Sequence, residues 1–162
     1  MPEKIKTRKV KTSWGKIKIG LLNGRVVRCT LPFLAEPPDC PLTIKEAGND
    51  SASRFVAATL TGKSIKAPTH GKLEGTVFQQ KVWHAIARIP FGKVQTYGEL
   101  AHAIGRPRAC RAVANACGQN PVPLFIPCHR VIRSAGTPGG FSAGLPWKRL
   151  LLAREQRLFS QN

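Results

Sequence analysis

Residues 127–130 (Pro-Cys-His-Arg) are the part of the chain best suited to covalent chemistry. A cysteine thiolate is a strong nucleophile, and a neighbouring histidine can accept the thiol proton. Apolar, β-prone residues flank the segment at 122–126 and 131–132, which favours a buried cysteine. Cys128 is therefore either an unreactive core thiol or a reagent held in a shielded place, and the two alternatives imply different functions.

The backbone around Cys128 decides whether His129 can act on it. Adjacent residues of a strand point to opposite faces of the sheet. Contact between the two side chains therefore requires a turn or a water molecule that relays the proton, and Pro127 favours an irregular backbone here. A base is needed because a free thiol with a pKa of about 8.5 is only a few per cent ionised at neutral pH.

The composition indicates a folded protein with a polyanionic partner. The chain has 162 residues, 42% of them hydrophobic, enough for one compact unit or two small domains that share a core. Its 26 Lys and Arg against 8 Asp and Glu give a net charge of +18. Such an excess is tolerated best beside a polyanion, and nucleic acid is the natural candidate. An anionic membrane surface and a generally basic proteome are the alternatives.

The cysteines and the N-terminus indicate a soluble protein of a reducing compartment. The five cysteines contain no C-x-x-C pair, so neither a disulfide framework nor a zinc knuckle is expected. Residues 1–11 show no secretory signal, and no apolar run reaches the length that spans a bilayer. We therefore expect no membrane partner, and a location in the cytoplasm and nucleoid of a prokaryote or the nucleus of a eukaryote.

The first half of the chain has the pattern of a small α+β domain. Residues 10–31 alternate like a hairpin around the turn dipeptide Asn23-Gly24. Residues 32–49 have the composition of a loop, residues 51–60 predict a short helix, and residues 61–75 predict a linker. The boundary is placed there, with an N-terminal domain at 1–72 and a C-terminal domain at 73–162.

The second half has the pattern of a mostly helical domain. Thr76 can cap a helix over 77–88, and residues 146–156 predict a C-terminal helix. Between them, Thr96 and Glu99 form a capping box for a helix that runs to about residue 104. Gly105 then breaks the chain, and Pro107 suits the first position of a further helix that ends near residue 118. Two short helices joined by a tight turn predict a helix-turn-helix.

The second of these helices has features of a DNA contact. It carries arginines near its start and small residues elsewhere, so its backbone can approach a partner while the arginines reach phosphates or base edges. The arginines are Arg106, Arg108 and Arg111. The alternative is an ordinary helix pair in a core, and the net charge favours DNA. Cys110 and Cys117 lie seven residues apart, and we expect both to pack against the first helix.

Residues 77–155 contain a series of short motifs, each of which occurs once. They are Phe78-Gln79-x-x-Val82-Trp83, Ile89-Pro90-x-Gly92-x-Val94, Tyr97-x-x-Leu100-Ala101, Arg111-Ala112-Val113, Asn120-Pro121, Ile-Pro-Cys-His-Arg-Val-Ile at 126–132, Gly140-x-Ser142-x-Gly144-Leu145 and Leu152-x-x-Glu155. With these segments in register, about half of the chain resembles the O6-alkylguanine-DNA alkyltransferase family (methylated-DNA–protein-cysteine methyltransferases). The resemblance implies a ribonuclease-H-like N-terminal domain and a winged-helix-like helix-turn-helix in the C-terminal domain.

The resemblance also implies a role for each matching residue in the reaction. Cys128 would accept the alkyl group from the O6 atom of a damaged guanine. His129, through a bound water and with Glu155 behind it, would remove the thiol proton. Tyr97 would help to rotate the nucleotide out of the duplex and would protonate the leaving guanine, and Asn120 would brace the turn that carries the cysteine.

On the DNA side, the resemblance implies that Arg111 fills the gap left in the base stack. The carbonyl groups of Val131 and Cys128, together with Ser142, would line the guanine pocket. The remaining expected contacts with substrate and DNA come from Phe141, Arg106, Arg108, Ala112 and Asn115. Many relatives have tyrosine at position 141, so Phe141 lacks a hydroxyl donor that they possess.

The expected activity is direct-reversal DNA repair by a methylated-DNA–[protein]-cysteine S-methyltransferase that reacts once. No cofactor is expected, because the lesion itself carries the alkyl group. No zinc is expected either, because the spacings of Cys29, Cys40, His70 and His84 lack ligand pairs. The partner would be duplex DNA bound through its minor groove by a monomer, with cooperative binding left open. The alternatives are a lesion-binding protein without transfer and a cysteine-dependent hydrolase.

Overall fold

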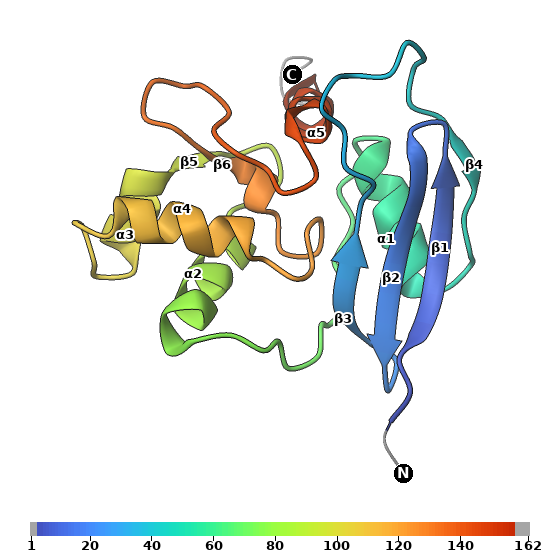
Figure 1. The fold of residues 1–162 in the computed structure, drawn as a ribbon, viewed down its shortest axis with the longest axis horizontal. Coiled ribbons are helices and arrows are strands. Elements are labelled where there is room, and N and C mark those ends of the chain that lie inside the picture. Colours follow the sequence, from blue (N-terminus) through green and yellow to red (C-terminus); the bar gives the residue numbers. More distant parts are fainter. Residues whose placement is uncertain (1–2, 158–162) are drawn as a thin grey trace.

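The structure is a computed structural model that describes residues 3–157, with Arg157 described by its backbone only. Its first half is built on a four-stranded antiparallel sheet of order β3-β2-β1-β4. The strands are β1 (Lys6–Thr12), β2 (Gly15–Leu22), β3 (Arg25–Thr30) and β4 (Ile44–Glu46). Helix α1 (Ser51–Leu60) covers one face of the sheet and lies behind it in Figure 1.

The predicted turn at Asn23-Gly24 is confirmed, but the sheet is larger than the predicted hairpin. Both turn residues have positive φ, at 50° and 75°, as a tight turn between twisted strands requires. The first strand begins at Lys6, and a second turn separates β1 from β2 at Gly15, where φ is 112°. The apolar residues alternate with polar ones in both β1 and β2, so the sequence pattern did not reveal the turn between them. The loop predicted at 32–49 contains the short strand β4, which pairs with β1.

The second half consists of helices and one short parallel strand pair. The elements are α2 (Val77–Ala87), β5 (Gln95–Thr96), α3 (Tyr97–Ala103), α4 (Cys110–Gly118), the 3-10 turn η1 (Cys128–Arg130), β6 (Val131–Ile132) and α5 (Leu145–Arg157). β5 pairs with β6. The capping box predicted at Thr96 is confirmed at the start of α3, and the cap predicted at Thr76 is confirmed at the start of α2, where Gln79 completes a capping box that was not predicted.

The predicted start of α4 at Pro107 is wrong by three residues. Gly105 has a φ of 72°, and the amide of Ala109 then donates to the carbonyl of Arg106, 2.8 Å away, in a turn. The helix therefore begins only at Cys110, and Arg106 and Arg108 lie before it. Cys117 is buried as expected. Cys110, the first residue of α4, is exposed, so its predicted packing against α3 is also wrong.

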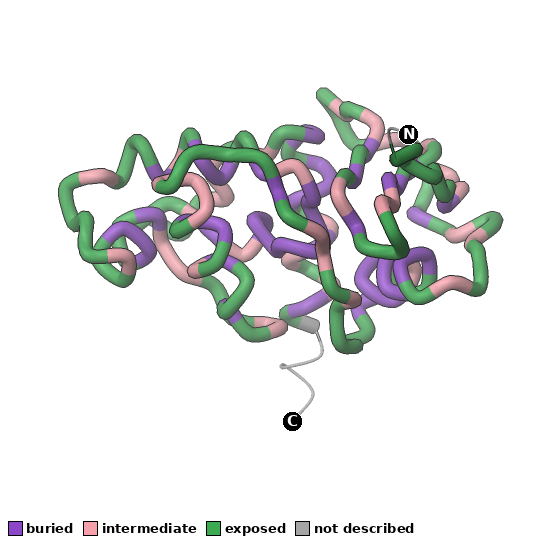
Figure 2. Tube along the Cα trace, turned by 90° about the horizontal axis from the view of Figure 1, so that it is seen from below, coloured by how far each residue is buried: buried purple, intermediate pink, exposed green. Residues whose placement is uncertain are grey.

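The two halves are joined by a strip of N-terminal backbone, residues 29–34. The amide of Cys29 donates to the carbonyl of Pro121 at 2.9 Å, and the amide of Leu34 donates to that of Ala143 at 2.9 Å. Gly144 packs so closely that a Cβ there would lie 1.8 Å from the carbonyl oxygen of Leu34. Buried residues occur throughout both halves and form one apolar cluster (Figure 2). The predicted mixed α/β architecture is confirmed; the boundary at 72/73 stays a prediction.

None of the helices within residues 3–157 has the length and apolar character needed to cross a membrane.

Candidate active site

A cavity of about 640 Å³ opens between α4, the start of α3, the turn η1 and the loop after β6. Its lining includes the thiol-bearing residue Cys128 and several residues that the sequence singled out. The lining residues are Tyr97, Cys110, Arg111, Ala114, Asn115, Cys117, Gly118, Cys128, Arg133, Gly140, Phe141 and Ser142. The cavity therefore combines a nucleophile, a phenol and two arginines on walls that are otherwise mostly small or apolar.

Cys128 is the first residue of η1, so the irregular backbone expected around it is confirmed. Its amide donates to the carbonyl of Ile126 at 2.8 Å, and its side chain is buried with 5% of its surface exposed. Burial raises the pKa of Cys128, while a hydrogen bond with the Asn120 side chain and the charge of Lys148 act in the opposite direction. The resting thiol is consequently protonated and needs a base to become reactive.

Asn120 holds the loop that leads to Cys128. Its Nδ2 donates to the carbonyl of Ile126 at 2.8 Å, and its Oδ1 accepts from the amide of Val122 at 3.0 Å. The side chain thereby closes the loop from both ends. Within the loop Leu124 has a φ of 76°, a left-handed conformation that is costly for a residue with a Cβ. The bracing role expected for Asn120 fits these contacts.

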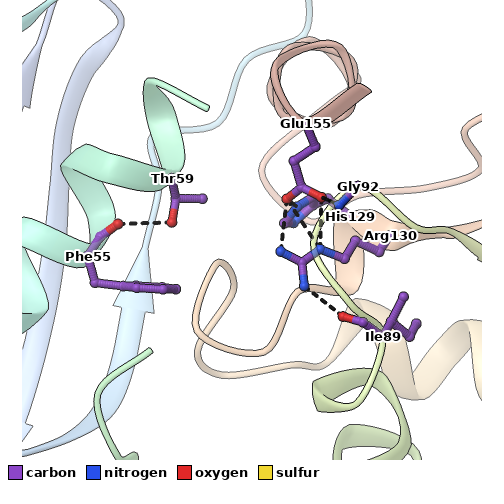
Figure 3. Close-up of polar contacts among 7 residues, drawn as sticks. All are labelled: Phe55, Thr59, Ile89, Gly92, His129, Arg130 and Glu155. Carbon is purple, nitrogen blue, oxygen red and sulfur yellow. Dashed lines mark hydrogen bonds and ion pairs between the residues drawn. The ribbon is translucent and has the colours of Figure 1, made fainter. Parts of the chain in front are cut away.

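His129 is fully buried and points away from solvent toward α5 (Figure 3). Its Nε2 lies 2.6 Å from Oε1 of Glu155. A carboxylate can only accept a hydrogen bond, so Nε2 carries the proton and Nδ1 has a free lone pair. Among the described side chains, Nδ1 is the buried polar atom without a hydrogen-bond partner. Burial lowers the pKa of His129, against the opposing effect of Glu155, so the ring is neutral and able to accept a proton.

Glu155 is held by more than His129, through contacts that sequence reasoning missed. Arg130 donates to it from Nε at 2.9 Å and from Nη2 at 3.0 Å, and the amide of Gly92 donates at 3.0 Å. Nη1 of Arg130 reaches the carbonyl of Ile89 at 2.7 Å (Figure 3). Burial alone would raise the pKa of Glu155, but the hydrogen bonds from His129 and Arg130 outweigh it and lower the pKa to about 2. The carboxylate therefore stays ionised.

Lys148 is a second buried charge that sequence reasoning missed. Its Nζ donates to the carbonyl of Val131 at 2.6 Å and to that of Gly140 at 3.0 Å, which ties the loop after β6 to its base. Nζ also lies 5.8 Å from the ring centre of Tyr97. Burial lowers the pKa of Lys148 to about 8. A signal existed in the sequence: Lys148 and Glu155 are seven residues apart on the helix face that also carries Trp147 and Leu151.

Tyr97 lies at the first position of α3 with its side chain in the cavity wall. Its ring packs against Gly139, where a Cβ would lie 2.8 Å from the phenol oxygen. Burial raises the pKa of Tyr97 to about 12, so the phenol keeps its proton at neutral pH. The group is suited to donate a hydrogen bond or a proton.

The structure brings some of the other predicted residues to the cavity and leaves others outside it. Arg111, Asn115, Phe141 and Ser142 line it. Ala112 is exposed on α4, and Arg106 and Arg108 line a separate shallow depression at the turn before α4. Val131 is buried outside the cavity lining, and its carbonyl accepts the hydrogen bond from Lys148. Arg133, at the cavity rim, was not predicted.

No group of three or more His, Cys, Asp or Glu side chains within residues 3–157 is placed to hold a metal ion. The side chains at the cavity and behind it offer a thiol, a buried neutral imidazole that can take the thiol proton, and a phenol that can supply a proton.

Residues 77–157 match the family model described as 6-O-methylguanine DNA methyltransferase, DNA binding domain. The chain belongs to this family. The matched region contains α2 through α5 and thus the whole Cys128, His129 and Glu155 arrangement. The resemblance drawn from the motifs of residues 77–155 is confirmed.

Curated relatives and solved structures support the same assignment. The chain is 51% identical over 86 residues to a probable methylated-DNA–protein-cysteine methyltransferase of Acanthamoeba polyphaga mimivirus (53% of this chain, 57% of the relative). It is 45% identical over 105 residues to the methylated-DNA–protein-cysteine methyltransferase of Methanosarcina barkeri (65% of this chain, 66% of the relative). The chain thus spans less than two thirds of the length of these relatives.

The fold extends beyond the region of high sequence identity. The crystal structure of the Mycobacterium tuberculosis O6-methylguanine methyltransferase superposes with a TM-score of 0.79 at 29% identity, over 98% of this chain and all of that one. A crystal structure of the same bacterium's protein in complex with DNA gives a TM-score of 0.76 at 30% identity, over 93% of this chain and 92% of that one. The likeness therefore includes the N-terminal sheet as well as the helices.

Proposed function

We propose that this protein repairs O6-alkylguanine in duplex DNA by transferring the alkyl group to Cys128, once per molecule. The observation that carries the proposal is the arrangement at η1. Cys128 lines an open cavity, and the next residue is a buried neutral histidine whose Nε2 is fixed by Glu155 and whose Nδ1 is free to accept a proton. Family membership supports the same chemistry.

The proposed reaction moves one proton and one alkyl group. Nδ1 of His129 takes the Cys128 proton through a water. Glu155 holds the ring in place and stabilises its charged form, and Arg130 holds Glu155. The sulfur then attacks the alkyl carbon, and the carbon–O6 bond breaks with its electron pair left on the guanine, which receives a proton from Tyr97. The proton held by His129 then returns through water to the Tyr97 phenolate, so that one proton moves overall from the thiol to the guanine. The product is a thioether, which has no good leaving group, so the protein reacts once and no cofactor is needed.

The proposed DNA contact uses α4 and the turn before it. The reacting atom lies inside a stacked duplex, so the nucleotide must be extruded at a cost of a few kcal/mol. Arg111 would enter the vacated space, while Ala112 and Asn115 let the helix approach the minor groove and Arg106 and Arg108 reach phosphates. Phe141 and Ser142 would form the opposite wall around the extruded base. Lys148 would hold the Val131 carbonyl at the edge of the site.

We further propose a monomeric state and two structural units that meet near residues 72 and 73. A DNA substrate would place the protein in the nucleoid of a prokaryotic cell or the nucleus of a eukaryotic one.

The test is to incubate the protein with a duplex that contains O6-methylguanine and to measure its intact mass. The expected result is one added methyl group on the Cys128 peptide, with saturation at one per protein. Cys128→Ala should abolish transfer and retain DNA binding. Binding of the wild type without a mass change would instead identify a lesion-binding protein, and repeated turnover would identify a hydrolase.

A second measurement tests the role of Arg111. Arg111→Ala should slow repair in duplex DNA much more than transfer from free O6-benzylguanine, because only the duplex requires a filled base stack. Equal losses on the two substrates would rule out the base-stack role.

A further inference from the structure

The outer face of the N-terminal sheet carries a dense group of cations, which we call the basic sheet face: Lys9, Lys11, Lys16, Lys18 and Arg28. The register of the strands places them together. Val10 and Ile17 are paired, fully buried and turned toward α1, so the alternate residues point to the opposite, uncovered side. Lys9, Lys16, Lys18 and Arg28 are exposed there.

The lysines of this face stand directly opposite one another. Lys9 pairs with Lys18, and Lys11 pairs with Lys16. Side chains in such positions have Cβ atoms about 5 Å apart, and like charges there destabilise a sheet. Every charged side chain in β1, β2 and β3 is Lys or Arg. Of the four lysines, Lys11 has a carboxylate partner, Glu46 on β4. Among the described residues, Lys9, Lys16 and Lys18 have none.

We propose that the basic sheet face binds the phosphate backbone of a second duplex DNA segment, separate from the segment that α4 holds; this inference rests on the proposed function. A polyanion compensates the repulsion that the fold leaves in place. Gly20 and Thr30 occupy the outward positions between the cations, and one exposed aliphatic side chain, Ile5, lies over Gly20. A lipid-binding surface would carry several aromatic or aliphatic side chains there. In Figure 1 the sheet and α3 lie at opposite ends of the long axis, which favours two segments.

A second DNA contact suits a protein that must find rare lesions. Electrostatic, sequence-independent contacts let a protein slide and hop along DNA. With two such surfaces, the protein can hold one duplex through the basic sheet face while α4 engages another. Transfer between segments then avoids full dissociation.

The test uses a triple substitution, Lys9→Gln, Lys16→Gln and Lys18→Gln, with a matched control. The control is Lys63→Gln, Lys66→Gln and Lys72→Gln, which removes the same number of positive charges, three, from exposed positions of the segment between α1 and α2. Protein saturating one immobilised undamaged duplex is challenged with a second, labelled duplex. The sheet variant should capture at least about tenfold less label, and the control should match the wild type. The salt slope of the capture should fall by about 3 in the sheet variant, from about 0.9 per lost phosphate contact.

Capture that is unchanged in the sheet variant, or equally reduced in the control, would overturn the proposal. So would a sheet variant that loses binding to phosphatidylserine vesicles or to an RNA hairpin while its DNA capture is unchanged. Single-turnover methyl transfer from a short lesion duplex should be the same in all three proteins. If the wild type itself fails to transfer, the proposed function fails, while the capture of undamaged DNA still reports on the basic sheet face. The thermal midpoint of the sheet variant should not fall, since opposed charges are removed.

Discussion

Replacing Glu155 by glutamine tests the buried network behind Cys128 most directly. Glutamine keeps the shape of the side chain and one acceptor oxygen but has no charge. Arg130, whose side chain is 14% exposed, would then lack its counter-charge, and the neutral His129 ring would lose the carboxylate that accepts from its Nε2. A pKa of Glu155 that falls from 4.5 to about 2 corresponds to roughly 3 kcal/mol in favour of the folded state. The loss of one partner of a buried ion pair is of the same size, about 3–5 kcal/mol.

The direction of the pKa change fixes the pH dependence. Because folding lowers the pKa of Glu155, its contribution is complete above pH 4.5 and disappears as the pH falls toward about 2. Urea denaturation at pH 7 should therefore show a loss of about 3 kcal/mol in Glu155→Gln. The difference from the wild type should shrink in a series of measurements below pH 4.5. The transfer rate should also fall, by roughly 10²–10⁴-fold, since His129 loses the group that orients it.

Glu46→Gln is the matched control, because Glu46 is an exposed carboxylate whose side chain is 64% exposed and pairs with Lys11. Its stability should change by less than about 1 kcal/mol. The reasoning about the Glu155 network is refuted if Glu155→Gln behaves like this control at pH 7, or if its difference from the wild type is the same at pH 7 and pH 3.

Three further substitutions, one of them with a matched control, test the parts around the thiol. Asn120→Ala removes both hydrogen bonds that close the loop before Cys128 and should cost about 2–4 kcal/mol in urea denaturation; a loss below 1 kcal/mol would deny the brace. Gly144→Ala places a Cβ against backbone and should cost more than about 3 kcal/mol. Gly105 also has a positive φ, 72° against 101° at Gly144, but faces open space, so Gly105→Ala should cost about 1–2 kcal/mol; equal thermal shifts would contradict the close contact. Cys117→Ala should still accept one methyl group, because burial raises the pKa of Cys117 to about 12 and Cys128 is the thiol that His129 follows in η1; methyl on the wild-type Cys117 peptide would contradict this.

Local chemistry made much of the fold predictable. The helix caps at Thr76 and Thr96 and the turn at Asn23-Gly24 depend on residues within three positions of one another, and all three occur where they were predicted. The start of α4 was predicted too early because proline is compatible both with the first position of a helix and with a turn that precedes one. Pro107 lies in such a turn. The strand β4 was missed because its three residues gain their order from pairing with β1.

In the candidate site, too, the sequence predicted local features better than contacts between residues far apart in the chain. The sequence pointed to the thiol and the histidine, which are neighbours in the chain. It did not reveal that Arg130 would share Glu155, because that contact joins residues 25 positions apart and depends on how α5 packs against η1. Lys148 is a similar case, since its partners are backbone carbonyls that leave no trace in the residue types.

The strip of backbone at residues 29–34 ties the N-terminal half to one wall of the cavity. The amide of Leu34 donates a hydrogen bond to the carbonyl of Ala143, which directly follows the cavity residues Phe141 and Ser142. The Trp147 indole donates to the carbonyl of Pro32 at 2.8 Å. A shift of this strip would move one wall of the cavity while leaving Cys128, His129 and Glu155 in place. Under the proposed function, a substitution in this strip is therefore expected to change which alkyl groups fit without altering any reacting side chain.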